Sequence, residues 1–76
     1  MAGTTTSQIL AEMVASVLSV AVEPGDAVEA GDTVMLLESM KMEIPVLVER
    51  AGTVHEVRVV PGDVIQEGDV LVVLGH

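Results

Sequence analysis

The sequence predicts an all-β domain, a flattened barrel or sandwich of two antiparallel sheets related by an internal pseudo-two-fold axis. Three observations support this fold class. Half of the residues are hydrophobic, none is aromatic, and valine is the most frequent type; β-branched side chains pack well on a pleated surface. The chain repeats itself internally. Each repeat also carries glycine-containing turn signals at the same places.

The repeat covers most of the chain. The segment SVLSVAVEPGDAVEAGDTVMLL begins at Ser16, and TVHEVRVVPGDVIQEGDVLVVL begins at Thr53, so the offset is 37 (53 − 16) and it holds without a gap. Two copies of a short β unit that cannot bury its own hydrophobic face should pack face to face. The identical positions are Val17, Val20, Val22, Pro24, Gly25, Asp26, Gly31, Asp32 and Leu37, which recur as Val54, Val57, Val59, Pro61, Gly62, Asp63, Gly68, Asp69 and Leu74.

Each repeat reads as strand, turn, short strand, turn and strand. The first turns, Pro24-Gly25 and Pro61-Gly62, fit type II geometry, because proline supplies the fixed φ and glycine accepts a positive φ. The second turns are Gly31-Asp32 and Gly68-Asp69. The four turn aspartates recur by duplication, which favours turn chemistry over calcium binding.

Alternation of side chains assigns faces to the strands. In the first repeat we expect Leu18, Val20 and Val22 to share one face, and in the second we expect the same of His55, Val57 and Val59.

The segment after residue 41 alternates more clearly. Met42, Ile44, Val46 and Val48 fall on one face, and Glu43, Pro45 and Glu49 fall on the other. Because proline cannot donate to a strand ladder, this strand should lie at a sheet edge or carry a bulge.

Length and charge restrict the remaining possibilities. A chain of 76 residues without cysteine allows one small domain, which we place at residues 9–76 after a flexible tail at residues 1–8. The formal charge of −9 disfavours nucleic acid and anionic membranes as partners. We expect a monomeric domain. No secretion signal or long apolar run is visible, so we expect a cytoplasmic location.

Lys41 is the sole lysine, and it lies between Met40 and Met42. The offset of 37 would relate position 41 to position 4 or 78, where the chain opens into its termini. Lys41 should therefore project from one end of the domain, with both termini at the other end. A tight β-hairpin with Lys41 at or beside its tip fits the flanking strands better than a helical turn of ESMKME, which is the competing interpretation.

The residues around Lys41 leave its role open. A lone surface charge that aids solubility is one interpretation, and gap-filling in an aromatic-free core is one for Met40 and Met42. An exposed lysine is almost wholly protonated at neutral pH, and Glu38 and Glu43 would favour that form. If Lys41 is modified, another enzyme must activate the amine.

ESMKM, both Pro-Gly-Asp turns, both Gly-Asp turns and the duplication together resemble the biotinyl (biotin/lipoyl attachment) domain family, over about residues 9–74. The likeness is greatest to small bacterial attachment proteins and biotin carboxyl carrier domains. There are departures: Ala15 stands where the second repeat has the family's usual glycine, Gly52, and Ser39 replaces the more usual alanine.

The resemblance implies a barrel-sandwich hybrid fold and a carrier function without catalysis. In such proteins a biotin–protein ligase joins biotin covalently to the matching lysine, here Lys41, and Met40 and Met42 contribute to recognition. A biotin carboxylase then loads a carboxyl group, and a carboxyltransferase passes it to an acyl-CoA or a keto acid. These enzymes are the partners that the resemblance implies.

Two other functions stay open. A lipoyl domain of a 2-oxo acid dehydrogenase or of glycine cleavage has the same fold and the same kind of lysine, although Met40 stands where such motifs usually have aspartate. An unmodified acidic interaction module is the second. An enzyme in its own right is disfavoured, because His55 lies in a strand, His76 is terminal, and no metal-ligand cluster or carboxylate–histidine pair appears.

Overall fold

The computed structural model describes residues 5–76, which form strands and turns and no helix. Within this range no helix exists that could cross a membrane. The strands are β1 (Thr6–Leu10), β2 (Ala15–Val20), β3 (Ala27–Val28), β4 (Thr33–Ser39), β5 (Met42–Leu47), β6 (Gly52–Val57), β7 (Val64–Ile65) and β8 (Val70–Gly75). All pairings between them are antiparallel.

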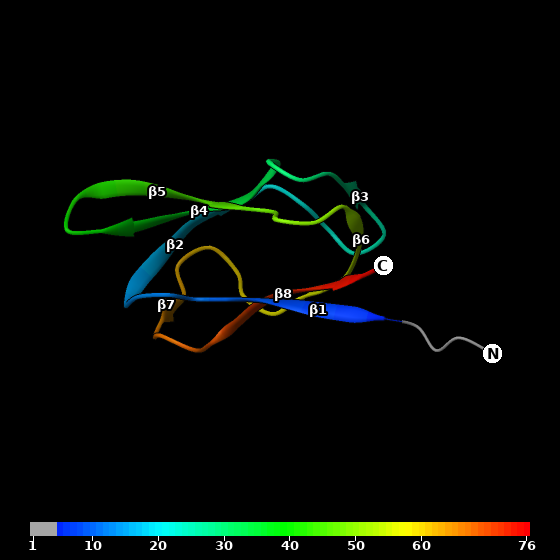
Figure 1. Ribbon diagram of the computed structural model, residues 1–76. Coiled ribbons are helices and arrows are strands. Elements are labelled where there is room, and N and C mark those ends of the chain that lie inside the picture. The colour runs from blue at the N-terminus through cyan, green and yellow to red at the C-terminus, as the bar shows by residue number, and fades with distance from the viewer. Residues whose placement is uncertain (1–4) are drawn as a thin grey trace.

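The strands form two four-stranded sheets that reproduce the sequence duplication. One sheet has the order β1-β8-β6-β3 and the other has the order β5-β4-β2-β7 (Figure 1). A shift of 37 residues converts β5, β4, β2 and β7 into β1, β8, β6 and β3, so the two sheets are equivalent strand by strand. The predicted fold class, two antiparallel sheets with an internal pseudo-two-fold axis, is confirmed.

The four predicted turns are built in the same way. Gly25, Gly31, Gly62 and Gly68 all have φ between 93° and 98°, which a type II turn requires at its third residue. In each turn the aspartate that follows the glycine accepts a hydrogen bond from the backbone N–H three residues earlier, at 2.8–3.0 Å. These aspartates therefore close the turns, as the duplication predicted.

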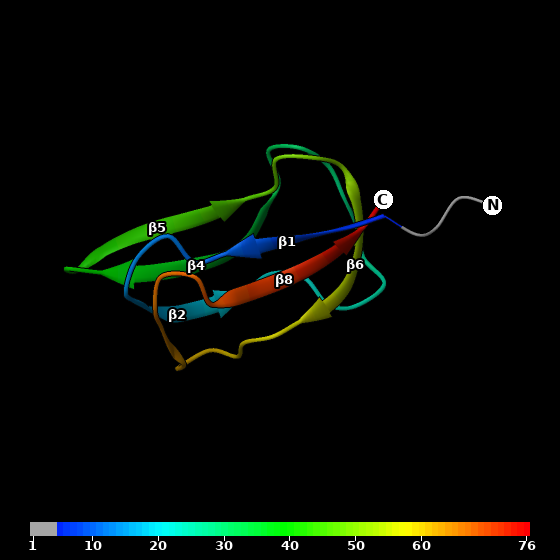
Figure 2. The ribbon, with the colours of Figure 1, turned by 60° about the horizontal axis from the view of Figure 1, so that its bottom comes forward.

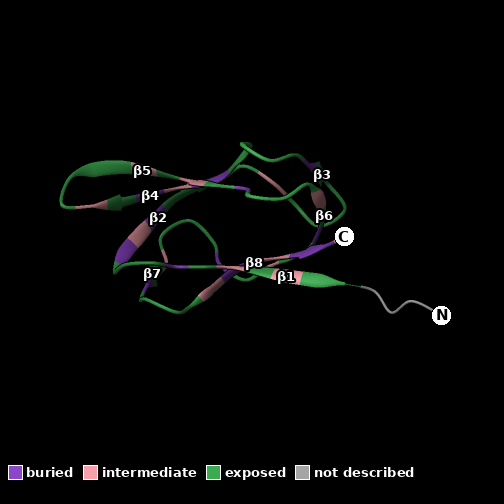
Figure 3. Cartoon of the chain, in the orientation of Figure 1, coloured by how far each residue is buried: buried purple, intermediate pink, exposed green. Residues whose placement is uncertain are grey.

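The core between the sheets is purely aliphatic. Its fully buried large side chains come from both repeats, and no polar or charged side chain within residues 5–76 is buried. Purple segments in Figure 3 mark the buried residues, which occur in both sheets. The largest of these side chains are Met35, Ile65, Leu71, Leu74, Val34, Val54 and Val72.

Bulges correct the face assignment in β2 and β6. The register shifts between Val17 and Ser19, and at the equivalent place between Val54 and Glu56. An extra residue reverses the alternation that follows it, so Val17 and Val54 are buried while Leu18 and His55 are exposed. The prediction that Leu18 and His55 share a face with the inward valines was wrong.

The edge strands behave as their sequences indicate. β5 is an edge strand, with Ile44 and Val46 packed on the core and Pro45 exposed. β1 is the equivalent edge, and it begins at Thr6 by pairing with Gly75 of β8. The boundary we expected at residue 9 thus lies inside a strand. Residues 1–4 of the expected tail lie outside the described part of the chain.

The fold places the β4–β5 hairpin at the pole opposite the start of β1 and the C-terminus. In Figures 1 and 2 the hairpin projects to the left, whereas the start of β1 and the end of the chain lie at the right. This is the arrangement that the 37-residue offset predicted for Lys41.

Candidate functional site: a lysine at the hairpin tip

Lys41 occupies a two-residue loop between β4 and β5. Ser39 pairs with Met42 across the hairpin, which leaves Met40 and Lys41 as the two loop residues. The tight hairpin predicted for this segment is confirmed, and the competing helical turn is excluded.

Both loop residues have a left-handed backbone. The φ angle is 54° at Met40 and 65° at Lys41. A positive φ at both central residues is the mark of a type I′ turn, whose twist matches that of the strands it joins. Such turns favour Asn-Gly, because ordinary side chains in this region cost about 1–2 kcal/mol each. The loop thus places Lys41 at the tip with a backbone that its side chain disfavours.

The side chains at the tip face solvent. Met40 is 88 % exposed and Met42 is 58 % exposed, and Lys41 is exposed as well. The interpretation of the two methionines as core fillers was therefore wrong. They instead form a polarizable, adaptable apolar surface on either side of the lysine.

No carboxylate in residues 5–76 is paired with the Lys41 amine. The single ion pair in this range joins Arg58 and Glu56 at 3.5 Å, far along the sequence from the hairpin. The nearest acidic residues in register are Glu38 and Glu43, which lie directly opposite each other one step below Ser39 and Met42. The amine is accordingly exposed, and within the described part of the chain no ion pair has to be broken before a reagent can reach it.

The histidines lie away from the tip. The ring of His55 occupies the space that a Cβ atom on Gly75 would need. His76 binds the Ser7 Oγ through Nε2 at 2.6 Å and the carbonyl oxygen of Ala51 through Nδ1 at 2.8 Å. Because a carbonyl can only accept, Nδ1 carries the proton, and the ring fastens β1 to the β5–β6 loop. This clasp was not predicted from the sequence.

Metal binding finds no support in residues 5–76. No group of three or more histidine or acidic side chains is arranged to hold an ion in this range. The four turn aspartates each use a carboxylate oxygen to close their own turn.

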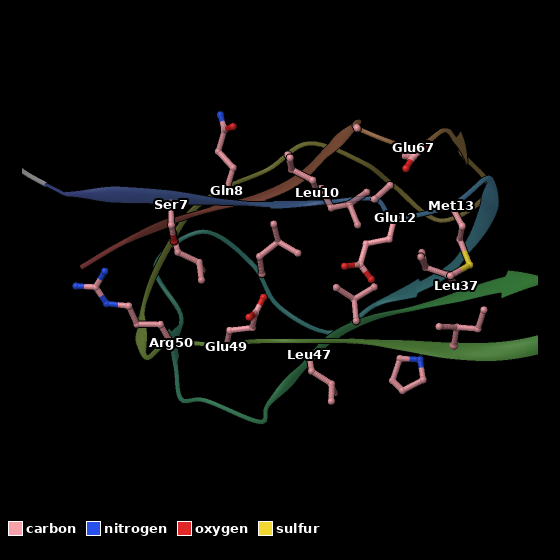
Figure 4. Close-up of a pocket in the computed structure, with 18 residues that line it drawn as sticks. Ser7, Gln8, Leu10, Glu12, Met13, Leu37, Leu47, Glu49, Arg50 and Glu67 are labelled. Carbon is pink, nitrogen blue, oxygen red and sulfur yellow. The ribbon is translucent and has the colours of Figure 1, made fainter.

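One groove lies along the body between the two edge strands β1 and β5. It encloses about 990 Å³ and is lined by Ile9, Ile44 and Leu71, among others. Figure 4 shows Glu12 and Glu49 directed into it and Gln8 and Leu47 turned away. None of residues 39–43 lines the groove, so it is separate from the lysine tip.

Comparison with known proteins identifies the family. The model of the biotin/lipoyl family, described as "Biotin-requiring enzyme", matches residues 5–74. Biotinylated protein TB7.3 of Mycobacterium tuberculosis (strain H37Rv) is 67 % identical over 39 residues, which is 51 % of this chain and 55 % of that protein. The chain thus spans about half the length of the curated relative that it matches.

Solved structures agree on the fold. The urea carboxylase of Kluyveromyces lactis matches 97 % of this chain with a TM-score of 0.86 and 28 % identity, over 6 % of its own length. A single-chain, multi-domain long-chain acyl-CoA carboxylase matches 90 % of this chain with a TM-score of 0.83 and 34 % identity, over 7 % of its own length.

A lipoyl domain shares the same shape. The lipoyl domain of the 2-oxoglutarate dehydrogenase complex from Azotobacter vinelandii matches 99 % of this chain and 98 % of its own, with a TM-score of 0.72 and 25 % identity. The backbone alone therefore does not distinguish biotinyl from lipoyl domains, whereas the family description and the biotinylated relative do. The chain therefore belongs to the biotin/lipoyl family, as a biotinyl domain.

Proposed function

We propose that this chain is a biotin carboxyl carrier and that Lys41 is its attachment site. The observation that carries the proposal is the position of the amine. It lies in the exposed two-residue loop of the β4–β5 hairpin, at the pole opposite the start of β1 and the C-terminus, and no carboxylate in residues 5–76 pairs with it.

The chain's own chemistry in this role is limited to one bond. The Lys41 ε-amine becomes an amide with the valerate carboxyl group of biotin, which removes its positive charge and takes the formal charge from −9 to one unit lower. A biotin–protein ligase must supply the activation: it joins the carboxyl group of biotin to AMP at the expense of ATP, and AMP leaves when the amine attacks and gives up its proton. When bound, biotin carries a carboxyl group between a biotin carboxylase and a carboxyltransferase.

The rest of the domain serves as a rigid holder. Tethering turns a diffusing cofactor into one at high local concentration for two separate active sites. The exposed Met40 and Met42 side chains offer a surface that can adapt to several partner enzymes. The domain itself is a non-catalytic carrier in this proposal, a monomer that acts in the cytoplasm.

The test is modification of matched variants by a biotin–protein ligase. We expect wild type to react with an avidin probe and Lys41→Arg to be silent at an unchanged melting temperature, because an exposed arginine keeps the charge and meets no new contact. A biotin signal from Lys41→Arg would overturn the assignment.

Lipoylation is the second candidate, and the likeness to a lipoyl domain across nearly its whole length favours keeping it. The mass added to the protein in its native host separates the two groups. An unchanged intact mass after treatment with ligase, ATP and biotin would instead support an unmodified interaction module.

A further inference from the structure

Because of the internal duplication, each exposed residue of one sheet has an equivalent residue on the other sheet with which it can be compared. Equivalent positions in the two sheets have the same backbone environment, so the fold makes the same demands on both. Where an exposed position differs in character between the sheets, folding does not explain the difference.

The row one step below Ser39 and Met42 differs in charge between the two sheets. On the lysine-bearing sheet, register places Glu43 opposite Glu38, then Ser16, then Val64. The equivalent row on the other sheet is Thr6, Gly75, Thr53 and Ala27. The uncharged twins show that the fold needs no carboxylate in this row.

Glu38 and Glu43 face each other directly across the hairpin. Like charges directly opposite each other across a strand pair repel. Within residues 5–76 neither Glu38 nor Glu43 has a cationic partner. We call these two residues the acidic pair. A binding partner with basic side chains would relieve the repulsion.

The next row differs in polarity. Pro45 lies opposite Leu36, and Leu36 lies opposite Ser19, beside which Leu18 bulges outward. Leu18 is 39 % exposed, and Leu36 is absent from the side chains packed on the core. We call Leu18, Leu36 and Pro45 the apolar strip.

On the other sheet this second row is largely polar. Gln8 and His55 stand at the positions equivalent to Pro45 and Leu18, and Val73 stands at that of Leu36. The exposed Leu47 on β5, by contrast, has an equally apolar and exposed twin in Leu10. The strip and the acidic pair thus both differ from their twins and both lie directly below the lysine. Other exposed twins differ as well, such as Ser19 and Glu56, but the second sheet carries neither an acidic pair nor an apolar strip at these rows.

We propose that the outer face of the β5-β4-β2-β7 sheet is the docking surface for the biotin–protein ligase, whose matching surface carries an apolar side chain flanked by arginine or lysine. This rests on the proposed function of Lys41. Charge complementarity selects a basic partner, and the strip adds apolar contact that excludes water. An enzyme seated on this face lies beside the hairpin tip and can reach the amine.

The experiment exchanges residues between the two faces. Leu18→His with Pro45→Gln gives the lysine-bearing sheet the residues of its twin, and His55→Leu with Gln8→Pro is the matched control. We expect the first variant to raise the KM of the ligase for the domain by about tenfold with kcat unchanged, because exposed apolar contact is lost from binding alone. The control should behave as wild type.

The acidic pair is tested by salt. Glu38→Gln with Glu43→Gln should flatten the dependence of kcat/KM on ionic strength, since charge attraction between exposed groups is screened. Melting temperatures are measured throughout. Leu18→Met keeps an apolar side chain and should retain the wild-type KM. It therefore still tests the strip if Leu18→His with Pro45→Gln has a lowered melting temperature.

Three outcomes would overturn the docking surface: an unchanged KM in Leu18→His with Pro45→Gln, an equal rise in the control, or a raised KM in Leu18→Met. In all three, wild type still gains biotin, so the proposed function survives. A wild-type domain that gains no biotin overturns the proposed function itself, and the docking proposal falls with it.

Discussion

The left-handed turn at the tip leads to a prediction about stability. Met40 has a φ of 54°, and an ordinary side chain in this region costs about 1–2 kcal/mol, whereas asparagine visits it readily. Met40 is 88 % exposed, so replacing it forfeits almost no packing. Met40→Asn should therefore stabilise the domain by about 0.5–1 kcal/mol.

Thermal and urea unfolding measure this gain. About 1 kcal/mol corresponds to about 4–8 °C in a domain of this size, so we expect a rise of about 2–8 °C. Met42→Asn is the control, because Met42 lies in strand β5 and asparagine is disfavoured in strands. It should leave the midpoint unchanged or lower it.

A Met40→Asn variant that melts at or below wild type would refute the reasoning. The loop would then not be strained in the way that its backbone angles indicate. Adding Lys41→Gly completes the Asn-Gly pair that type I′ turns favour. That double variant should keep the hairpin and yield no site for biotin, which separates the stability of the tip from its function.

Three further predictions concern the scaffold. Gly52→Ala should destabilise by about 1–3 kcal/mol, because a Cβ atom there would meet the carbonyl oxygen of Gly75 and the ring of His76; an unchanged urea midpoint would contradict this close approach. Asp63→Ala should lower the free energy of unfolding by about 0.5–1.5 kcal/mol, because the turn hydrogen bond is lost. Calcium added to wild type should leave its melting temperature unchanged. A rise in melting temperature with calcium would show that the turn aspartates bind the ion. Leu71→Ala should cost about 2–5 kcal/mol, since Leu71 is fully buried, and a loss below 1 kcal/mol would argue against this core.

The duplication is why so much of the fold was predictable. Glycine and proline at matched places determine the four turns, and the offset of 37 alone places Lys41 opposite the chain ends. Pro45 indicates an edge strand because it lacks a donor, and β5 is one. These features are local, or follow from symmetry, so they need no knowledge of side-chain packing.

Features that depend on register were missed. The bulges in β2 and β6 shift the alternation by one residue, and nothing in the local sequence distinguishes Leu18 facing out from Leu18 facing in. The start of β1 at Thr6 depends on pairing with β8, which is distant in sequence.

At the tip, the sequence predicted the hairpin but not the left-handed backbone of its loop. The loop residues are Met40 and Lys41, and neither is an asparagine or a glycine, the residues that indicate a type I′ turn. The positive φ angles, and the strain they imply, could therefore not be predicted from the sequence. The same limit applies to the clasp made by His76, whose two partners are 69 and 25 residues away.

The most direct test of the account is to locate the modification by peptide mass spectrometry on protein treated with a biotin–protein ligase, biotin and ATP. We predict a single biotinyl group, carried by the ε-amine of Lys41. Biotin on any other residue, or none at all on a folded domain, would contradict it.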